Sequence, residues 1–223
     1  MSALWFAVAG AGLGLTVTLP AVRWMARGGH RLPEERELRP PSLRWTIPLG
    51  VAATALVGAA RAGRPALAVL YCLATALLIV LATIDADVHR LPDRWTKPAW
   101  VIVPPALLVL TLAESTGLAP WWRALASGVG LGLFYLVLVL LGGGSGMGLG
   151  DAKLAATLGA LLGFLSVEHV LAATLVTVIA GGVHALVQLL VRRRDRASHM
   201  AFGPFMVAGA VLVIAAPALT LLR

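Results

Sequence analysis

Eight apolar runs, separated by short polar connections, constrain this chain more than any other feature of its sequence. Several approach the roughly 20 apolar residues that an α-helix needs to cross a bilayer. The runs are Leu4–Val22, Thr46–Ala60, Ala66–Ile84, Ala99–Leu112, Leu125–Leu141, Leu154–Leu165, Val170–Val191 and Phe202–Leu222. The hydrocarbon core offers the backbone no water, so spans of this kind must be helical. We therefore expect an all-α, polytopic transmembrane helical bundle of about eight spans.

The composition favours a membrane protein and excludes several other classes. Charged residues make up 13% of the chain and hydrophobic residues 59%, whereas about 25% of a soluble domain is charged. The single cysteine, Cys72, excludes an internal disulfide and a cysteine-based zinc cluster, so we expect neither a metal nor another cofactor. The net charge of +8 could indicate nucleic acid, but its distribution is better explained by membrane topology. We expect one integral-membrane domain over residues 1–223.

The basic residues are unevenly distributed between the two sides of the membrane. With eight spans and an outside N-terminus, four connections face the cytoplasm. They are 23–45, 85–98, 142–153 and 192–201. These connections hold 14 of the 18 Lys and Arg residues, as expected for cytoplasmic loops. This topology places Asp85 and Asp151, 66 residues apart in the sequence, at the same cytoplasmic face.

Asp85 and Asp151 each border a long apolar run in a chain with ten acidic residues. A charged side chain at the centre of a membrane helix costs about 2.5–3.5 kcal/mol on insertion scales. A membrane protein keeps such a group where water, a partner or a substrate compensates it. Two carboxylates that share one proton can activate water for hydrolysis. We therefore predict that Asp85 and Asp151 form a catalytic pair.

Two neighbouring acids, Asp87 and Asp93, have a simpler explanation. Arg90 and Arg94 lie in the same polar stretch and can neutralise them. Pro92 can start the next helix, and Asp93 would then lie in its first turn, where the helix dipole favours a negative charge. We expect neither acid to be required for the chemistry.

A glycine-rich stretch from Gly142 to Gly150 precedes Asp151. Glycine permits positive φ angles and the close approach of another backbone, and irregular backbone at membrane depth is tolerated where it lines a wet cavity. We predict that Gly148, Gly150 and Lys153 form a substrate loop beside Asp151. The alternative is a flexible loop that ends in an N-cap aspartate, with Lys153 as a basic anchor at the membrane surface.

Two motifs and a C-terminal stretch occur in the order and spacing of a known family. They are Ile84-Asp85 followed by Pro92-Asp93, Gly148-Leu149-Gly150-Asp151 followed by Gly159-Ala160, and Ala201-Phe202-Gly203-Pro204-Phe205. Over roughly residues 70–215, the chain resembles the type IV prepilin leader peptidases, which are membrane aspartic proteases of the GxGD type.

The resemblance implies a multi-pass protein of the bacterial cytoplasmic (inner) membrane with an active site facing the cytoplasm. It implies an aspartic endopeptidase that removes the leader peptide from type IV prepilins or pilin-like precursors, with Asp85 and Asp151 as the catalytic acids. The implied partners are the precursor and the lipid bilayer, and the implied processes are type IV pilus assembly and protein secretion. Which precursor is the substrate, and the oligomeric state, stay open.

The chain departs from the family on its N-terminal side. Full-length relatives carry a zinc-binding insertion with two Cys-x-x-Cys pairs after the first span. Here residues 23–45 are short, charged and proline-rich, without a cysteine. We expect a solvated, basic cytoplasmic loop without a zinc site, and the family's second activity, N-methyl transfer, stays open.

Two other classes of function also stay open. An ion- or proton-coupled transporter would use intramembrane acids and glycine-broken helices. A non-catalytic component of a pilus or secretion machine would tolerate asparagine in place of either acid. The expected placement of both acids near one face, rather than at the midplane, favours the peptidase.

Overall fold

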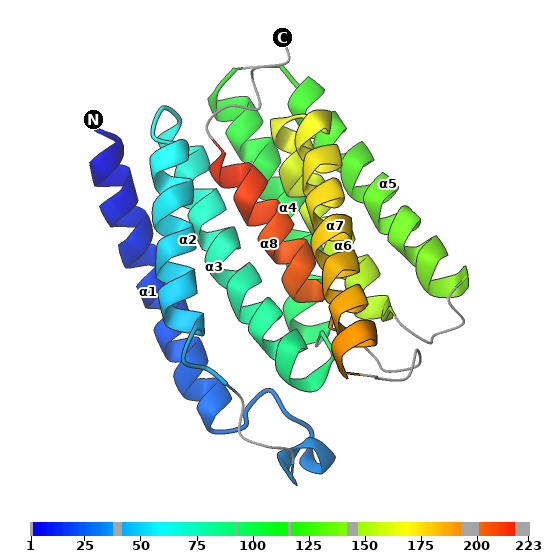
Figure 1. The fold of residues 1–223 in the computed structure, drawn as a ribbon. Coiled ribbons are helices and arrows are strands. Elements are labelled where there is room, and N and C mark those ends of the chain that lie inside the picture. Colours follow the sequence, from blue (N-terminus) through cyan, green and yellow to red (C-terminus); the bar gives the residue numbers. More distant parts are fainter. Residues whose placement is uncertain are drawn as a thin grey trace. The chain divides into compact units, whose positions relative to one another are not determined.

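The computed structural model describes residues 2–37, 42–91, 93–115, 117–141, 147–192 and 201–216. Within these ranges every regular element is a helix (Figure 1). The α-helices are α1 Ala3–Ala26, α2 Thr46–Ala60, α3 Pro65–Val88, α4 Asp93–Ala113, α5 Ala119–Leu141, α6 Leu149–Leu165, α7 Val167–Arg192 and α8 Gly203–Ala215, and η1, Pro33–Glu37, is a 3-10 helix. The predicted all-α fold is confirmed.

Five of the described helices, α1, α3, α4, α5 and α7, are long and apolar enough to cross a bilayer. The helices α2 and α8, with 15 and 13 residues, fall below the roughly 17 residues at the lower limit for a transmembrane helix. Helix α6 has 17 residues. The expected multi-pass membrane character is confirmed, whereas the expected number of about eight spans is an overcount.

Helix α3 continues beyond the apolar run that predicted it. It ends at Val88, so Asp85 and Asp87 lie in its last turns, and the prediction of a connection over 85–98 is wrong. A polar side chain at the end of a membrane helix can meet water or a partner while its backbone stays hydrogen-bonded within the helix. The helix ends where His89 adopts a left-handed conformation with φ of 50°, which is common just after a helix end.

Helices α4 and α6 also begin earlier than their apolar runs. Helix α4 starts at Asp93, which confirms the predicted first-turn position of that acid. Helix α6 starts at Leu149, five residues before the predicted Leu154. Both starts place a carboxylate within the first helical turn, where the positive end of the helix dipole stabilises it.

The described residues form two compact units. The first contains α1, α2 and α3, which run side by side in blue to blue-green (Figure 1), together with the residues from Ile214. The second runs from His89 to Val213 and contains α4 to α7 and most of α8. The expectation of a single domain over 1–223 stays a prediction.

Small residues bring α1 and α2 of the first unit into close contact. A Cβ atom added to Gly10 would overlap the Thr54 carbonyl oxygen, and one added to Gly14 would overlap the Thr54 hydroxyl. A Cβ on Gly58 would overlap the Phe6 carbonyl oxygen. Glycines at such interfaces let membrane helices approach backbone to backbone, so α1 and α2 pack without large side chains between them.

Helix α1 ends in a Schellman motif that turns the chain back. The N–H of Gly28 donates to the Met25 carbonyl, at 2.9 Å, and the N–H of Gly29 donates to the Trp24 carbonyl, at 3.2 Å. Gly28 has φ of 72°, a left-handed conformation that glycine adopts without a Cβ penalty. Met25 packs in a buried cluster with Ile84 of α3, which fixes the end of α3 that carries the acids.

In the second unit, α5 and α6 meet through small residues. A Cβ on Gly132 would lie 2.9 Å from the Ala156 Cβ, and one on Gly128 would lie 3.2 Å from the Ala160 Cβ. Arg123 of α5 donates to three carbonyl oxygens in the last turn of α6, at 2.7, 2.7 and 3.1 Å. A cation at a helix C-terminus satisfies these carbonyls and the helix dipole. These contacts hold α6, and with it the aspartate at its start, in place.

Candidate active site

Asp85 lies on α3, three residues before the helix ends. Its exposed fraction is 4%, and the neighbouring Ile84 is fully buried. The carboxyl group is therefore withdrawn from bulk solvent in the part of α3 that packs against the end of α1. A buried carboxyl must be protonated, paired or hydrogen-bonded.

Asp151 lies in the first turn of α6, two residues after the helix begins. The N–H of Gly148 donates to Asp151 Oδ2 at 3.0 Å, and the N–H of Asp151 donates to the Gly148 carbonyl at 3.0 Å. The N-cap is therefore Gly148, and Asp151 caps the helix from its third position. With 6% of its surface exposed, Asp151 is buried at the positive end of the α6 dipole.

These two acids differ from the others that the structure describes. Asp85 and Asp151 are buried, whereas Asp87, Asp93 and the described glutamates are at least partly exposed. The two buried acids lie on different compact units, so their pairing remains a proposal.

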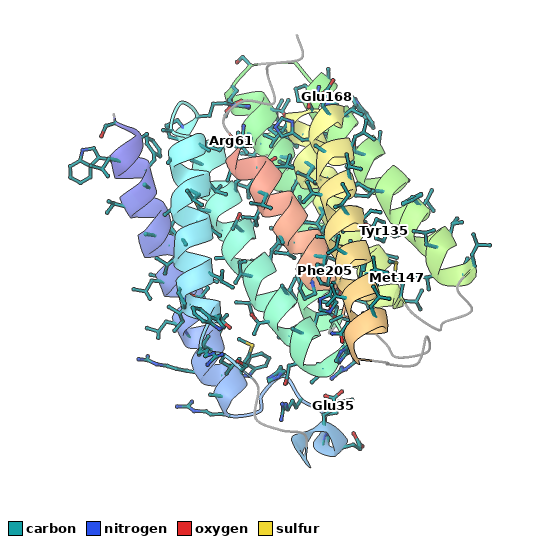
Figure 2. The ribbon with its side chains drawn as sticks, viewed as in Figure 1. Glu35, Arg61, Tyr135, Met147, Glu168 and Phe205 are labelled. Atoms are coloured by element: carbon teal, nitrogen blue, oxygen red, sulfur yellow. The ribbon has the colours of Figure 1, made fainter. Side chains whose placement is uncertain are left out.

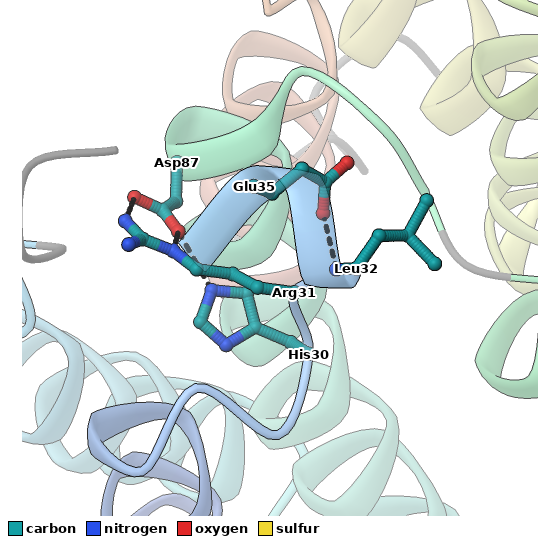
Figure 3. Close-up of polar contacts among 5 residues, drawn as sticks. All are labelled: His30, Arg31, Leu32, Glu35 and Asp87. Atoms are coloured by element: carbon teal, nitrogen blue, oxygen red, sulfur yellow. Dashed lines mark hydrogen bonds and ion pairs between the residues drawn. The ribbon is translucent and has the colours of Figure 1, made fainter. Parts of the chain in front are cut away.

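Asp87, the acid closest in sequence to Asp85, is held by the segment after α1 (Figure 3). Arg31 donates to both of its oxygens, from Nε at 2.8 Å and from Nη2 at 2.7 Å. His30 Nε2 lies 2.7 Å from Asp87 Oδ2. The exposed fractions of the His30, Arg31 and Asp87 side chains are 0%, 5% and 11%. We call these three residues the Asp87 cluster.

The Asp87 cluster corrects one expectation from the sequence. The stretch 23–45 is not a solvated loop at His30 and Arg31, because both side chains are buried against the end of α3. The hydrogen bond to Asp87 raises the pKa of the Arg31 guanidinium above its usual value. Neither residue was predicted from the sequence, although a histidine and an arginine directly after a Gly-Gly helix stop are a signal for such a contact.

Asp93 is engaged by two lysines in the second unit. It accepts a short hydrogen bond from Lys153 of α6, and it pairs at 2.8 Å with Lys97, one turn along α4. The hydrogen bonds from Lys153 and then from Lys97 lower the pKa of Asp93 to about 2. The carboxylate therefore ties the start of α4 to the start of α6. The main-chain carbonyl of Lys153 also accepts a hydrogen bond from Trp100 Nε1, at 3.1 Å.

Gly148, Gly150 and Lys153, which were predicted to form a substrate loop, lie at the start of α6. A Cβ on Gly150 would lie 2.9 Å from the Leu91 Cβ, whereas one on Gly148 would meet nothing closer than 3.8 Å. Gly150 is therefore required for the close approach of the segment before α4, and Lys153 is engaged by Asp93. Gly142 to Gly146 lie outside the described residues, and the substrate loop stays a prediction.

The C-terminal motif packs in the second unit. Phe202 lies 6.2 Å from Tyr135 of α5, and Phe205 lies 5.1 Å from His184 of α7, between ring centroids (Tyr135 and Phe205 are labelled in Figure 2). The buried Tyr135 interacts electrostatically with Asp151. Tyr135 is thus a neighbour of the site that sequence analysis missed, although a tyrosine within an apolar run was a signal. His184 thus packs against an aromatic ring.

A comparison with protein families decides the membership of the chain. Residues 72–186 match the sequence profile of the type IV leader peptidase family. The match covers slightly more than half of the 223 residues and includes both buried acids. The chain belongs to the type IV leader peptidase family. No curated protein and no solved structure gives a significant match.

Membership confirms the resemblance seen in the sequence and identifies the chain as a protease. Among the described residues, no group of three or more His, Cys, Asp or Glu side chains is placed to hold a metal ion. The cysteine, Cys72, is buried on α3 and donates from Sγ to the Thr54 carbonyl at 3.3 Å. Asp87 and Asp93 each join two segments of the chain, within the first and the second unit respectively.

Proposed function

We propose that this leader peptidase is an aspartic endopeptidase that uses Asp85 and Asp151 as its catalytic pair. It would cleave the leader peptide from type IV prepilins or pilin-like precursors at the cytoplasmic face of the inner membrane. The observation that carries the proposal is the burial of these two acids alone among the described acids. Both also lie within the residues that match the family profile, in the two sequence motifs on which the resemblance to the family rests.

The chemistry follows from placing two carboxyl groups close together. Two such groups do not both ionise readily, so they hold one proton between them and titrate as a unit. The ionised member removes a proton from water while the water oxygen attacks the scissile carbonyl carbon. The protonated member donates its proton to the carbonyl oxygen. Collapse of the tetrahedral intermediate then returns a proton to the leaving amine, and no covalent enzyme intermediate forms.

Helix geometry assigns a role to each acid in this proposal. Asp151 lies at the positive end of α6 and accepts the Gly148 N–H, and both features favour its ionised form. Asp85 lies at the negative end of α3, which favours the form that carries the proton. Asp151 is therefore the base that activates water, and Asp85 is the acid that polarises the substrate carbonyl.

The neighbouring acids are not candidates for this pair, because each is already neutralised. Asp87 accepts hydrogen bonds from a buried arginine, and Asp93 from two lysines. Proton exchange by either carboxylate would first require breaking these contacts. Asp87→Asn and Asp93→Asn are therefore matched control variants within the same chain.

Cleavage of a co-expressed pilin-like precursor tests the proposal. The variants Asp85→Asn and Asp151→Asn should each lose activity by about 10²–10⁴-fold or more, the usual contribution of a general acid or base. Asp87→Asn and Asp93→Asn should retain measurable activity. Mass spectrometry of the precursor reports cleavage, and the amount of enzyme in the membrane fraction is measured for each variant.

Normal cleavage by either Asp85→Asn or Asp151→Asn would refute the pair. Loss of cleavage in all four variants, at wild-type amounts of folded enzyme, would remove the distinction between catalytic and anchoring acids. Cleavage of leaderless control protein by the wild type would refute the leader-specific activity.

A further inference from the structure

A groove in the second unit lies between α4, α5 and α6 and has a volume of about 450 Å³. We call it the α4–α5–α6 groove, with Val103, Gly132 and Ala156 on its three walls. Small residues line the groove where α5 and α6 meet, since a Cβ on Gly132 would lie 2.9 Å from the Ala156 Cβ. The lining is almost entirely hydrocarbon, with Leu133 of α5 half exposed at its edge.

The groove is separate from the proposed active site. Its residues on α6 recur every three or four positions and include Lys153 and Ala156. Asp151 precedes Lys153 by two residues, about 200° around the helix. The groove therefore lies on the face of α6 opposite Asp151, and a peptide bond held in it would not reach that carboxylate.

One end of the groove is basic and aromatic. Lys153 and Trp100 line this end, and Asp93 holds Lys153 and Lys97 together. The side chains of Lys97 and Lys153 are 65% and 28% exposed. An ammonium group has three N–H donors, and each lysine gives one to Asp93. Two lysines and one aspartate leave a net charge of +1 at this end.

The backbone adds to this positive potential. Helices α4 and α6 both begin at this end of the groove, and helix N-termini favour anions. Trp100, an exposed residue whose Nε1 donates to the Lys153 carbonyl, is of the type that lies at the membrane–water boundary. A hydrocarbon groove between membrane-spanning helices thus ends in a site for one negative charge at headgroup depth.

We propose that the α4–α5–α6 groove binds one anionic phospholipid, with an acyl chain along the groove and the phosphate at Lys97 and Lys153. The apolar lining matches the acyl chain, and the net positive charge at its end matches the headgroup. Basic pockets between transmembrane helices bind anionic lipid headgroups in this way. A zwitterionic lipid carries no net charge and gains less from the same site.

Native mass spectrometry of the full chain, released from detergent micelles, tests this proposal. The protein is titrated with phosphatidylglycerol and with phosphatidylethanolamine of identical acyl chains. One phosphatidylglycerol should bind more tightly than phosphatidylethanolamine. Lys97→Gln and Lys153→Gln should each weaken phosphatidylglycerol binding about fivefold, the contribution of one basic residue near an anionic lipid surface. Arg44→Gln, in the segment before α2, is the control and should change nothing.

Two further variants separate the proposal from a general loss of folding. Asp93→Asn removes the counterion and should tighten phosphatidylglycerol binding about fivefold, whereas a structural defect would weaken it. Ala156→Leu fills the groove and should weaken binding of both lipids, and Ala113→Leu, at the exposed end of α4, is its control. Inorganic phosphate at the lipid concentration should not displace the lipid.

Equal binding of the two lipids, or weaker binding to Asp93→Asn, would overturn the proposal. Displacement by inorganic phosphate would show an anion site that needs no acyl chain and would overturn it as well. A groove covered by a second copy of the chain would instead give a dimer that Ala156→Leu dissociates. A groove covered by a precursor helix would give precursor binding that Ala156→Leu weakens. If Ala156→Leu dissociates a dimer or weakens precursor binding but does not change lipid binding, the lipid assignment is overturned.

Discussion

Replacing Arg31 with alanine should destabilise the protein by about 3 kcal/mol while leaving the proposed catalytic pair intact. Arg31 makes two hydrogen bonds to Asp87, of 2.7 and 2.8 Å, and the two side chains are 5% and 11% exposed. Removing one partner of a buried ion pair costs about 3–5 kcal/mol, because the other charge stays buried without compensation. His30 remains beside Asp87, so the low end of that range applies.

A double-mutant cycle isolates the interaction from other effects of each substitution. The cycle uses Arg31→Ala, Asp87→Ala and the double variant, and it measures the free energy of unfolding of the purified protein in mixed micelles by helical circular dichroism. The coupling energy should be about 2–3 kcal/mol, well above the 0.2–1 kcal/mol found for exposed ion pairs. The pair of Asp93 and Lys97, which is exposed, is the matched control and should give a much smaller coupling.

Two results, one from the cycle and one from a cleavage assay, would each contradict a different step. A coupling between Arg31 and Asp87 no larger than that of the control pair would refute the energetic role of the buried cluster. Loss of precursor cleavage in Asp87→Asn, at a temperature where the variant is folded, would refute the choice of Asp85 over Asp87 as the catalytic acid.

The remaining predictions concern other contacts. Gly150→Ala should cost about 1–3 kcal/mol of unfolding free energy, because its Cβ would lie 2.9 Å from that of Leu91; Gly148→Ala should cost less, and equal costs would contradict this explanation. Cys72→Ala and a strong chelator should each leave precursor cleavage unchanged, and loss of cleavage on chelation would refute a metal-free mechanism. Asp93 has a folded pKa of about 2 against an ordinary 3.8, so its stabilisation is present above about pH 4 and is lost as the pH falls towards 2. The difference in Tm between wild type and Asp93→Asn should therefore be constant from neutral pH to about 4, and a decline above pH 5 would contradict the low pKa.

Hydrophobicity predicted the existence of the helices because every residue of a membrane-spanning helix contributes to the free energy of its transfer into the bilayer. The run Thr46–Ala60 matches α2 at both ends, since Arg44 lies two residues before it and Arg61 directly follows it. The end of α3 was missed because Asp85 and Asp87 are polar, although their backbone continues the helix. Hydropathy does not register a helical turn whose side chains are charged and compensated by partners elsewhere in the chain.

At the candidate site, too, features set by local sequence were predicted and features set by distant contacts were not. The first-turn position of Asp93 and the position of Asp151 at the start of a helix follow from local sequence, because proline is favoured at the first helical position and an aspartate before an apolar run marks a helix start. The partners of Asp87 and Asp93 do not follow from local sequence. Arg31 lies 56 residues from Asp87, and Lys153 lies 60 residues from Asp93. No local periodicity encodes a contact between charges so far apart, and it follows only from helix packing.

The close packing of α1 and α2 has a consequence for biogenesis. Helix α2 is about 22 Å long at 1.5 Å per residue, shorter than the roughly 30 Å hydrocarbon core, so it is a poor insertion signal by itself. Gly10 and Gly14 offer it a surface on α1 along which the two backbones meet. The pair is thus expected to enter the bilayer as a hairpin, with α1 as the template. Bulky substitutions on that surface would then reduce how much enzyme escapes membrane quality control rather than how fast each surviving molecule works.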